Sequence, residues 1–213
     1  MTTMMGRITA IEPQKRRGDR MSIFVDGKFV VGAHQDVVIA LGLAVGQLFD
    51  TDTLEELVRA ETVRKARESA LRLIAYRDRT ISEIRKRLAG SDFEEDVVDE
   101  VLKQLIHAEL VNDEKFSRDW VKNRSAAKPM GRTRLAWELR SKGVELPCVE
   151  RALEGLDEEA EYRLALETAT KKISKADLSD PKLKNRLSSF LARRGFGWEV
   201  IARVVGEVLT EKD

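Results

Sequence analysis

The chain has 213 residues, of which 42% are hydrophobic and 35% are charged, and its formal net charge is +1. The charged share exceeds the usual quarter of a globular protein, which favours helices that bury narrow apolar stripes and keep large solvated faces. No run of about 18 apolar residues occurs, which excludes a transmembrane helix. A single cysteine, Cys148, excludes an intrachain disulfide and a cysteine cluster for a metal. Because the N-terminus also lacks a signal-peptide core, we expect a cytoplasmic protein.

The first 52 residues differ from the rest of the chain. Short β-prone runs occupy Ile8–Ile11, Met21–Val25 and Lys28–Val31. Asp26 and Gly27 separate the last two runs, and this dipeptide is typical of a tight hairpin turn because both residues accept a positive φ. We therefore predict a small β-hairpin extension, with no strand after Val31.

A basic segment, Gln14 to Arg20, follows the first of these runs. It is interpreted as a charged, solvated turn at the far end of the small sheet, with contact to a phosphate or an acidic partner as the alternative. A short helix is expected near Asp36–Leu41. A long helix without glycine or proline is then predicted from about Thr53 to Tyr76.

An internal repeat organises the remainder of the chain. Leu88, Leu139 and Leu191 occupy the same place in three similar helix–turn–helix patterns, at offsets of 51 and 52 residues. The fold class is therefore mainly α, with three tandem three-helix repeats after the N-terminal extension. The predicted segments are 1–52 for the extension, 53–111 for the long helix and first repeat, 112–156 for the second repeat and 157–213 for the third.

Turn and cap residues support this register. Gly143 and Gly195 are expected in the left-handed conformation after the second helix of their repeats, and Asp92 takes the glycine position in the first repeat. Thr80 with Glu83 matches a capping box, and Asp92 with Glu95 matches it more weakly. Two further helix starts are marked by Asn112 or Asp113 in the second repeat and by Asp180-Pro181 in the third.

Three aromatic residues are interpreted as packing residues. Phe116 and Trp120 lie one helical turn apart, so burial is favoured over base stacking. Trp198 shares the register of Leu146, and we expect it to pack as well.

No catalytic constellation can be assembled from the sequence. It lacks a phosphate-binding glycine loop, a dinucleotide fingerprint and a zinc-protease motif. The only histidines, His34 and His107, are far apart, and His107 suits the end of an acidic helix. We therefore expect neither an enzyme nor a bound cofactor or metal.

One helix face stands out. If Leu135 and Leu139 face the core, Trp137 points away from it, with Arg134 and Arg140 three residues to either side. Trp137 either packs against a neighbouring repeat or forms part of a contact surface, since tryptophan and arginine are favoured interface anchors.

Basic residues gather in two segments, near 120–144 and 171–195, whereas 91–114 is acidic. Because asparagine and glutamine are scarce on the predicted helices, phosphate or acidic-partner binding fits better than base reading. The candidate partner- and nucleic-acid-binding residues are Lys122, Arg124, Lys128, Arg132, Arg134, Trp137, Arg140, Lys142, Lys171, Lys172, Arg186, Arg193 and Arg194.

Four stretches in a fixed order resemble the RecX regulatory proteins of bacteria: RDRTISEIRKRL (77–88), LVNDEKF (110–116), DWVKNR (119–124) and GRTRLAWELRSKGV (131–144). The resemblance covers roughly 66–209, and the IFVDGKF hairpin is similar to an extension of some members. Two departures fall at one turn: Glu109 stands where the family usually has glycine, and Asn112-Asp113 replaces a commoner acidic pair.

The resemblance implies a regulator that binds the RecA recombinase filament on single-stranded DNA and inhibits RecA's ATPase, strand exchange and filament extension. From the clustered basic residues we expect weak, non-specific binding to single-stranded DNA, and we expect a monomer with no membrane partner. The alternative is a helix-turn-helix transcription regulator, which a specific operator footprint would favour.

Overall fold

The computed structural model of the protein describes residues 5–14, 17–174 and 180–210. It divides into two compact units, each described here by itself. Unit 1 comprises Met1–Arg77 and Ile84–Leu110, and unit 2 comprises Asp78–Glu83 and Val111–Asp213.

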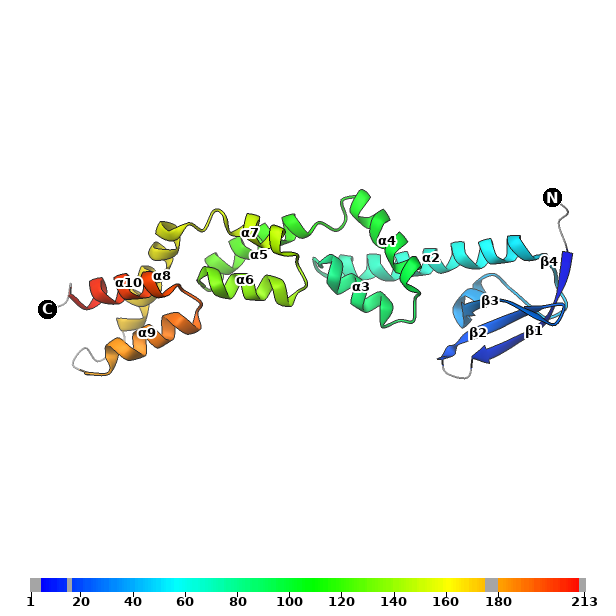
Figure 1. The fold of residues 1–213 in the computed structure, drawn as a ribbon, viewed down its shortest axis with the longest axis horizontal. Helices are drawn as coiled ribbons and strands as arrows, with labels where there is room; N and C mark the ends of the chain where they lie inside the picture. The colour runs from blue at the N-terminus through cyan, green and yellow to red at the C-terminus, as the bar shows by residue number, and fades with distance from the viewer. Residues whose placement is uncertain (1–4, 15–16, 175–179, 211–213) are drawn as a thin grey trace. The chain divides into compact units, whose positions relative to one another are not determined.

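Unit 1 begins with a four-stranded antiparallel sheet of order β3-β2-β1-β4 (Figure 1). The strands are β1 (Met5–Gln14), β2 (Arg17–Val25), β3 (Lys28–His34) and β4 (Leu48–Asp50). The predicted hairpin turn is confirmed, since Asp26 and Gly27 between β2 and β3 have φ of 48° and 79°. Two positive φ values in succession match a primed turn, whose twist suits antiparallel strands.

The expectation that no strand follows Val31 was wrong. β3 continues to His34, and β4 adds a fourth strand by pairing with β1 through Met5–Asp50, Gly6–Phe49 and Arg7–Leu48. A strand of three residues carries too little period-2 pattern to be read from the sequence. Its conformation depends on hydrogen bonds from β1, which the sequence does not display.

The sheet packs against two helices, α1 (Gln35–Ala40) and α2 (Thr51–Tyr76). Asp50 caps α2 by accepting a hydrogen bond from the Thr53 N–H at 3.2 Å. Leu54 and Val58 of α2 are buried with Ile8 and Ile23 of the sheet in one apolar cluster. The sheet and the first half of the long helix therefore share a core.

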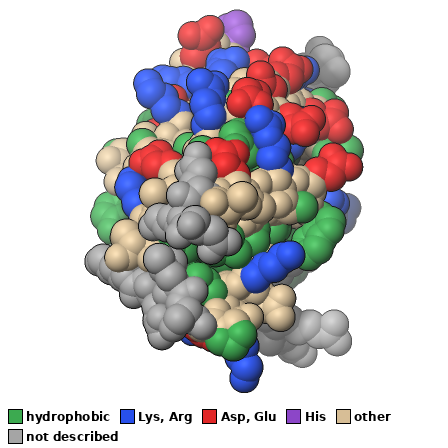
Figure 2. All heavy atoms as spheres, turned by 90° about the vertical axis from the view of Figure 1, so that its left-hand side faces the viewer, with side chains coloured by type: hydrophobic (Ala, Val, Ile, Leu, Met, Phe, Trp, Pro, Cys, Tyr) green, Lys and Arg blue, Asp and Glu red, His purple; other side chains and the backbone are tan. Residues whose placement is uncertain are grey.

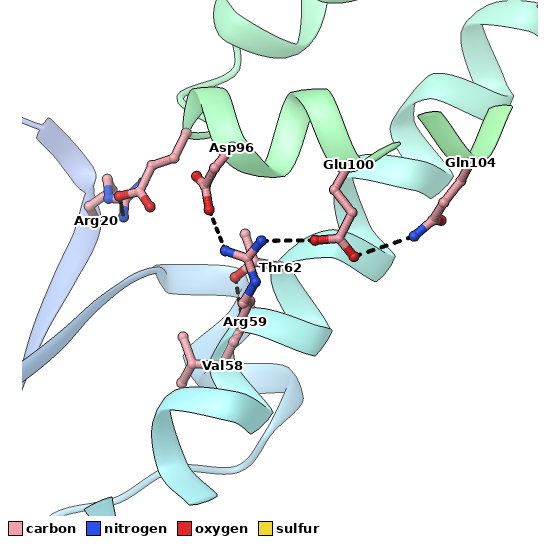
Figure 3. Close-up of polar contacts among 8 residues, drawn as sticks. Arg20, Val58, Arg59, Thr62, Asp96, Glu100 and Gln104 are labelled. Carbon is pink, nitrogen blue, oxygen red and sulfur yellow. Dashed lines mark hydrogen bonds and ion pairs between the residues drawn. The ribbon is translucent and has the colours of Figure 1, made fainter. Parts of the chain in front are cut away.

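Arg20 corrects the interpretation of the basic segment as a wholly solvated turn; Lys15 and Arg16 of that segment lie outside the described residues. Arg20 is buried in β2, and its guanidinium donates to the Gly32 and Asp92 carbonyls at 3.2 and 3.1 Å and to Glu94 at 2.7 Å. The cation therefore meets an acidic group of its own chain. Figure 3 shows Arg20 reaching from its strand toward α4 (Glu95–His107).

A second arginine joins two helices of unit 1 beside this contact (Figure 3). Arg59 of α2 forms ion pairs with Asp96 and Glu100 of α4, the latter at 2.8 Å. The hydrogen bonds that Arg59 donates to the two carboxylates hold the pKa of Arg59 above its ordinary value, and Arg59 in turn lowers the pKa of Asp96. These groups are about half exposed, so the pairs orient α4 more than they stabilise it.

The three-helix repeats are confirmed (Figure 1). The end of α2 leads into α3 and α4; α5, α6 and α7 form the second repeat, and α8, α9 and α10 the third. The bounds are α3 (Ile81–Ala89), α5 (Asp113–Ala127), α6 (Arg132–Ser141), α7 (Leu146–Leu153), α8 (Glu158–Ile173), α9 (Leu183–Arg193) and α10 (Trp198–Thr210). The division at 52, 111 and 156 stays a prediction.

The turn after the second helix has the expected conformation in each repeat. Asp92, Gly143 and Gly195 have φ of 59°, 78° and 82°. Glu109 also has a positive φ of 54°, so this departure from the family's glycine keeps the left-handed turn. The chain therefore uses non-glycine residues at two positions where glycine would cost less.

Helix caps agree with the sequence in part. Asn112 accepts from the Lys115 N–H at 2.9 Å, and Thr80 Oγ1 accepts from the Glu83 N–H at 3.1 Å, as predicted. The predicted box at Asp92 and Glu95 was wrong, because Glu94 occupies the N-cap of α4 without a side-chain hydrogen bond. Pro181 was misplaced too, since α9 begins two residues later, at Leu183.

Candidate binding surface

The second helix of the middle repeat, α6, carries the predicted face. Leu135 and Leu139 are fully buried in the repeat's core, where Phe116 and Trp120 pack half-buried against them, as predicted. Trp137, on the opposite side of α6, is 57% exposed. This indole does not belong to a core between repeats, so the contact-surface interpretation is the one that the geometry supports.

Trp137 is flanked by the two arginines as the helical spacing requires. The Arg134 guanidinium lies 4.4 Å from the centre of the indole ring, and its Nε is 3.5 Å from Glu138 Oε1. Arg140 is exposed, and among the described residues no carboxylate lies within 4 Å of it. α6 thus presents an indole with one arginine stacked on it and another available for a ligand.

An open groove of about 850 Å³ runs beside this face, between α6 and α7. Its floor includes Ala136, Val149 and Leu153, and Trp137 and Arg140 stand at its sides. Leu146, the first residue of α7, is 55% exposed at the groove. The surface is therefore amphipathic, with apolar side chains beside cations.

Two carboxylates, Glu138 and Glu83, account for two of the predicted basic residues. Glu138 is 7% exposed and accepts hydrogen bonds from Trp120 Nε1 and from Arg124 Nε, both at 3.0 Å. Lys142 lies 4.4 Å from the Trp120 ring centre and 3.3 Å from Glu83 Oε1. Arg124 therefore stabilises the second repeat, and Lys142 joins that repeat to Glu83 of α3, so neither belongs to the proposed surface.

Hydrogen bonds to backbone carbonyls account for two more of the predicted basic residues, Arg194 and Arg132. The Gly131 N–H donates to the Arg194 carbonyl at 2.9 Å, and Arg194 itself donates to the Pro129 carbonyl at 3.0 Å. Arg132 donates to the carbonyls of Leu153 and Leu156 at 2.7 and 3.0 Å. Arg194 therefore joins the end of α9 to the loop before α6, whereas Arg132 satisfies carbonyls at the end of α7 and just after it.

The other predicted cations differ in whether their side chains have a partner within the protein. Lys171 pairs with Glu167, Arg186 pairs with Asp180, and the Lys172 Nζ lies 5.4 Å from the Phe190 ring centre. Within the part of the chain that the structure describes, four exposed predicted cations have no carboxylate, aromatic ring or backbone carbonyl against their side chains: Lys122, Lys128, Arg140 and Arg193. These four are the cations most available to an external anion.

The interpretation of Trp198 as a packing residue was wrong. Trp198 begins α10 and is 71% exposed, at one side of a groove between α9 and α10. Figure 2 views the molecule from the side on which α9 and α10 lie in Figure 1, and apolar side chains reach that surface. The exposure of Trp198 could have been predicted from the sequence. Trp198 shares the register of Leu146, and both are the first residue of a helix, where a side chain need not face the core.

Neither metal nor membrane features occur in the described part of the chain. Over 5–14, 17–174 and 180–210, no three histidine, cysteine, aspartate or glutamate side chains are grouped to hold a metal ion. In the same residues, no helix combines the length and apolar character that crossing a membrane needs.

Comparisons with known proteins agree with this architecture. The RecX N-terminal domain model matches 6–50, and the models of the first, second and third RecX three-helix domains match 66–105, 112–153 and 159–205. Regulatory protein RecX of Clostridium perfringens (strain SM101 / Type A) is 30% identical over 94% of this chain and 95% of its own length. That of Clostridioides difficile (strain 630) is 29% identical over 96% and 97%. A crystal structure of regulatory protein RecX superposes with a TM-score of 0.64 at 25% identity, covering 93% of this chain and 98% of that one.

Proposed function

The chain belongs to the RecX family of regulatory proteins, and we propose that it regulates RecA by binding the RecA filament on single-stranded DNA. In this proposal the bound protein limits RecA's ATPase, strand exchange and filament extension. We further propose a monomer that acts in the cytoplasm, where the DNA-bound filament lies.

The exposed face of α6 carries the proposal. Trp137 and Arg140 are residues of the types that most often anchor protein interfaces, and they stand beside an apolar groove instead of being used inside the repeat. Other residues of α6 already fill the core of the repeat, and Trp137 is 57% exposed. Such an exposed tryptophan is typical of a surface that a partner covers. We infer that RecA meets this face.

DNA contact is proposed as a secondary, sequence-tolerant contribution. The exposed cations Lys122, Lys128 and Arg193 can neutralise phosphates, but phosphate contacts carry no sequence information. Base reading would need side chains such as asparagine or glutamine directed into a groove. The DNA therefore adds affinity, and the protein partner supplies specificity.

The test is RecA's ATPase on single-stranded DNA, measured with the wild type and with the double variant Trp137→Ala/Arg140→Glu. We expect the variant to lose inhibition, with an affinity for the filament at least about tenfold lower, because it removes one anchor and reverses another. Its melting temperature should change little, since exposed side chains usually contribute within about 1 kcal/mol to folding.

A matched control is Tyr76→Ala/Arg163→Glu, which removes an exposed aromatic and reverses one exposed arginine elsewhere. The control should inhibit like the wild type. Full inhibition by the Trp137→Ala/Arg140→Glu variant would remove α6 from the mechanism. Absence of any wild-type effect, together with tight binding to one duplex sequence, would favour a transcription regulator instead.

A further inference from the structure

The third repeat contains a second groove with an exposed tryptophan. It has a volume of about 530 Å³ and lies between α9 and α10. Along α10, Trp198, Ile201, Ala202 and Val205 all line it, at the i, i+3, i+4, i+7 spacing of a single helical stripe. At about 1.5 Å per residue this stripe is roughly 10 Å long, about two turns of a helix laid along it.

Short side chains form the opposite wall of this groove. α9 contributes Ser188, Ser189 and Ala192, whose short side chains leave room for a partner backbone to approach. Among the described residues that line the groove, Lys184 is the only charged one. The groove is therefore apolar at its floor, aromatic at one side and cationic at one end.

This groove and the α6–α7 groove are the same feature in two repeats. Nine of the ten positions that line the first groove line the second when 52 is added to their number, the exception being Ser141. Leu146 therefore corresponds to Trp198 and Glu150 to Ala202. The tryptophan enters from α6 in one groove and from α10 in the other. Each of the two equivalent grooves therefore has an exposed indole, and the two tryptophans occupy different positions in their repeats.

The first repeat shows that the fold does not require an open groove there. Arg85 and Asp99 occupy the positions equivalent to Ala136 and Glu150, and they form an ion pair across α3 and α4 at 2.5 Å. Glu95 occupies the position of Trp198. A polar, bridged surface is compatible with the same three helices, so the apolar grooves are a property of the second and third repeats.

The lining favours a peptide over a nucleic acid. A single-stranded nucleic acid needs several cations to follow its backbone, and the α9–α10 groove offers one, Lys184. Ile201 and Val205 are nearly buried in the repeat's own core and form only the floor. Trp198 and Ala202 therefore supply the apolar contact, as in grooves that take the apolar face of a helix. One cation at the end of an apolar stripe is complementary to a segment with apolar anchors and an acidic residue.

We propose that the α9–α10 groove is a second docking site, which takes an amphipathic, acidic helical segment of the protein partner. The proposal rests on the proposed function, because the RecA filament is taken as the source of that segment. Trp198 anchors the apolar side of the segment and Lys184 meets its carboxylate.

The experiment measures binding of the full-length protein to RecA filaments on single-stranded DNA. Ala202 is exposed at the groove, and lysine and glutamate in its place have similar size and helix propensity. We expect Trp198→Ala to weaken filament binding at least tenfold. Ala202→Glu should weaken binding several-fold more than Ala202→Lys, because only the glutamate repels an acidic segment. All three variants should melt near the wild type.

Each other outcome overturns a stated part of the proposal. Wild-type affinity of Trp198→Ala for the filament would show that the groove is unused, while leaving the proposed function intact. Equal effects of Ala202→Glu and Ala202→Lys would rule out an acidic occupant. If Trp198→Ala weakens binding to labelled oligo-dT without RecA by the same factor, the groove takes DNA and the peptide assignment is wrong. If the wild type does not bind the filament at all, the proposed function fails and this inference fails with it.

Discussion

At the scale of single residues, Gly143 illustrates how the repeats meet in unit 2. Its φ is 78°, and a Cβ at this position would lie 2.1 Å from Ser82 Oγ. A left-handed backbone already costs an L-residue roughly 1–2 kcal/mol, and the close approach to Ser82 adds to it. We expect Gly143→Ala to destabilise the protein by at least about 2 kcal/mol, measured by urea unfolding.

The matched control for that variant is Gly155→Ala. Gly155 has no positive φ, and a Cβ there would meet no atom within 4 Å. Its replacement should change the unfolding free energy by less than about 1 kcal/mol, and can even raise it by reducing the entropy of the unfolded chain. Equal effects of the two alanines would mean that neither the φ nor the contact with Ser82 matters to the fold.

Asp113 gives a pH-dependent prediction at the same scale. Its carboxylate accepts from the Ile81 N–H at 2.9 Å, but burial, with smaller repulsions from Glu145 and Glu83, raises its pKa above the ordinary value. A raised carboxyl pKa makes ionisation cost stability, so the contribution of Asp113 is fully present below its unfolded pKa and is lost as the pH rises through its folded pKa.

Replacing Asp113 with asparagine should therefore stabilise the protein near pH 7, because the amide oxygen can still accept from Ile81 without a buried charge. The advantage should vanish near pH 3, where the wild-type carboxyl is protonated in both states. Melting temperatures of wild type and Asp113→Asn across this range test it. Asp119→Asn, an exposed carboxylate of the same helix, controls for the change in net charge.

At the scale of elements, two arginines that contact α4 differ in burial and should differ in energy. The Arg20 side chain is 7% exposed and serves two backbone carbonyls and Glu94, whereas Arg59 is 50% exposed. Arg20→Met should cost about 3 kcal/mol or more, because it leaves buried acceptors unpaired. Arg59→Met should cost less than about 1 kcal/mol. Thermal unfolding of the two variants compares them, and similar losses would contradict the role assigned to burial.

The same contrast explains what could be predicted from the sequence. Leu139 and Gly143 follow from helical spacing and from the φ that a C-terminal turn requires, both of which are local properties. Arg20 could not be assigned to Glu94, because 74 residues separate them and only the tertiary fold of unit 1 brings β2 to the start of α4. For the binding surface, Trp137 follows from the helix period. In the sequence, Arg124 and Lys142 cannot be distinguished from basic residues without a partner. Only the fold shows which carboxylate or aromatic ring each of them contacts.

At the scale of the whole molecule, the net charge of +1 conceals which charges remain available. Acidic residues of α4 are partly neutralised by arginines of unit 1, among them Arg59 and Arg85. In unit 2, the side chains of four of the predicted cations, Lys122, Lys128, Arg140 and Arg193, have no carboxylate, ring or backbone-carbonyl partner among the described residues. The positive charge of unit 2 is therefore more available than the sequence total indicates.

This leads to a prediction for single-stranded DNA without RecA. If the four cations Lys122, Lys128, Arg140 and Arg193 each neutralise one phosphate, log K should fall by about 0.7 per phosphate, or roughly three decades in affinity for each decade of salt. Titration of labelled oligo-dT at several salt concentrations measures this slope. Lys122→Gln/Lys128→Gln should reduce it by about half, since two of four counterion-releasing contacts are lost. Binding that is independent of salt, or an unchanged slope in the double variant, would show that the exposed cations of unit 2 do not contact the phosphates.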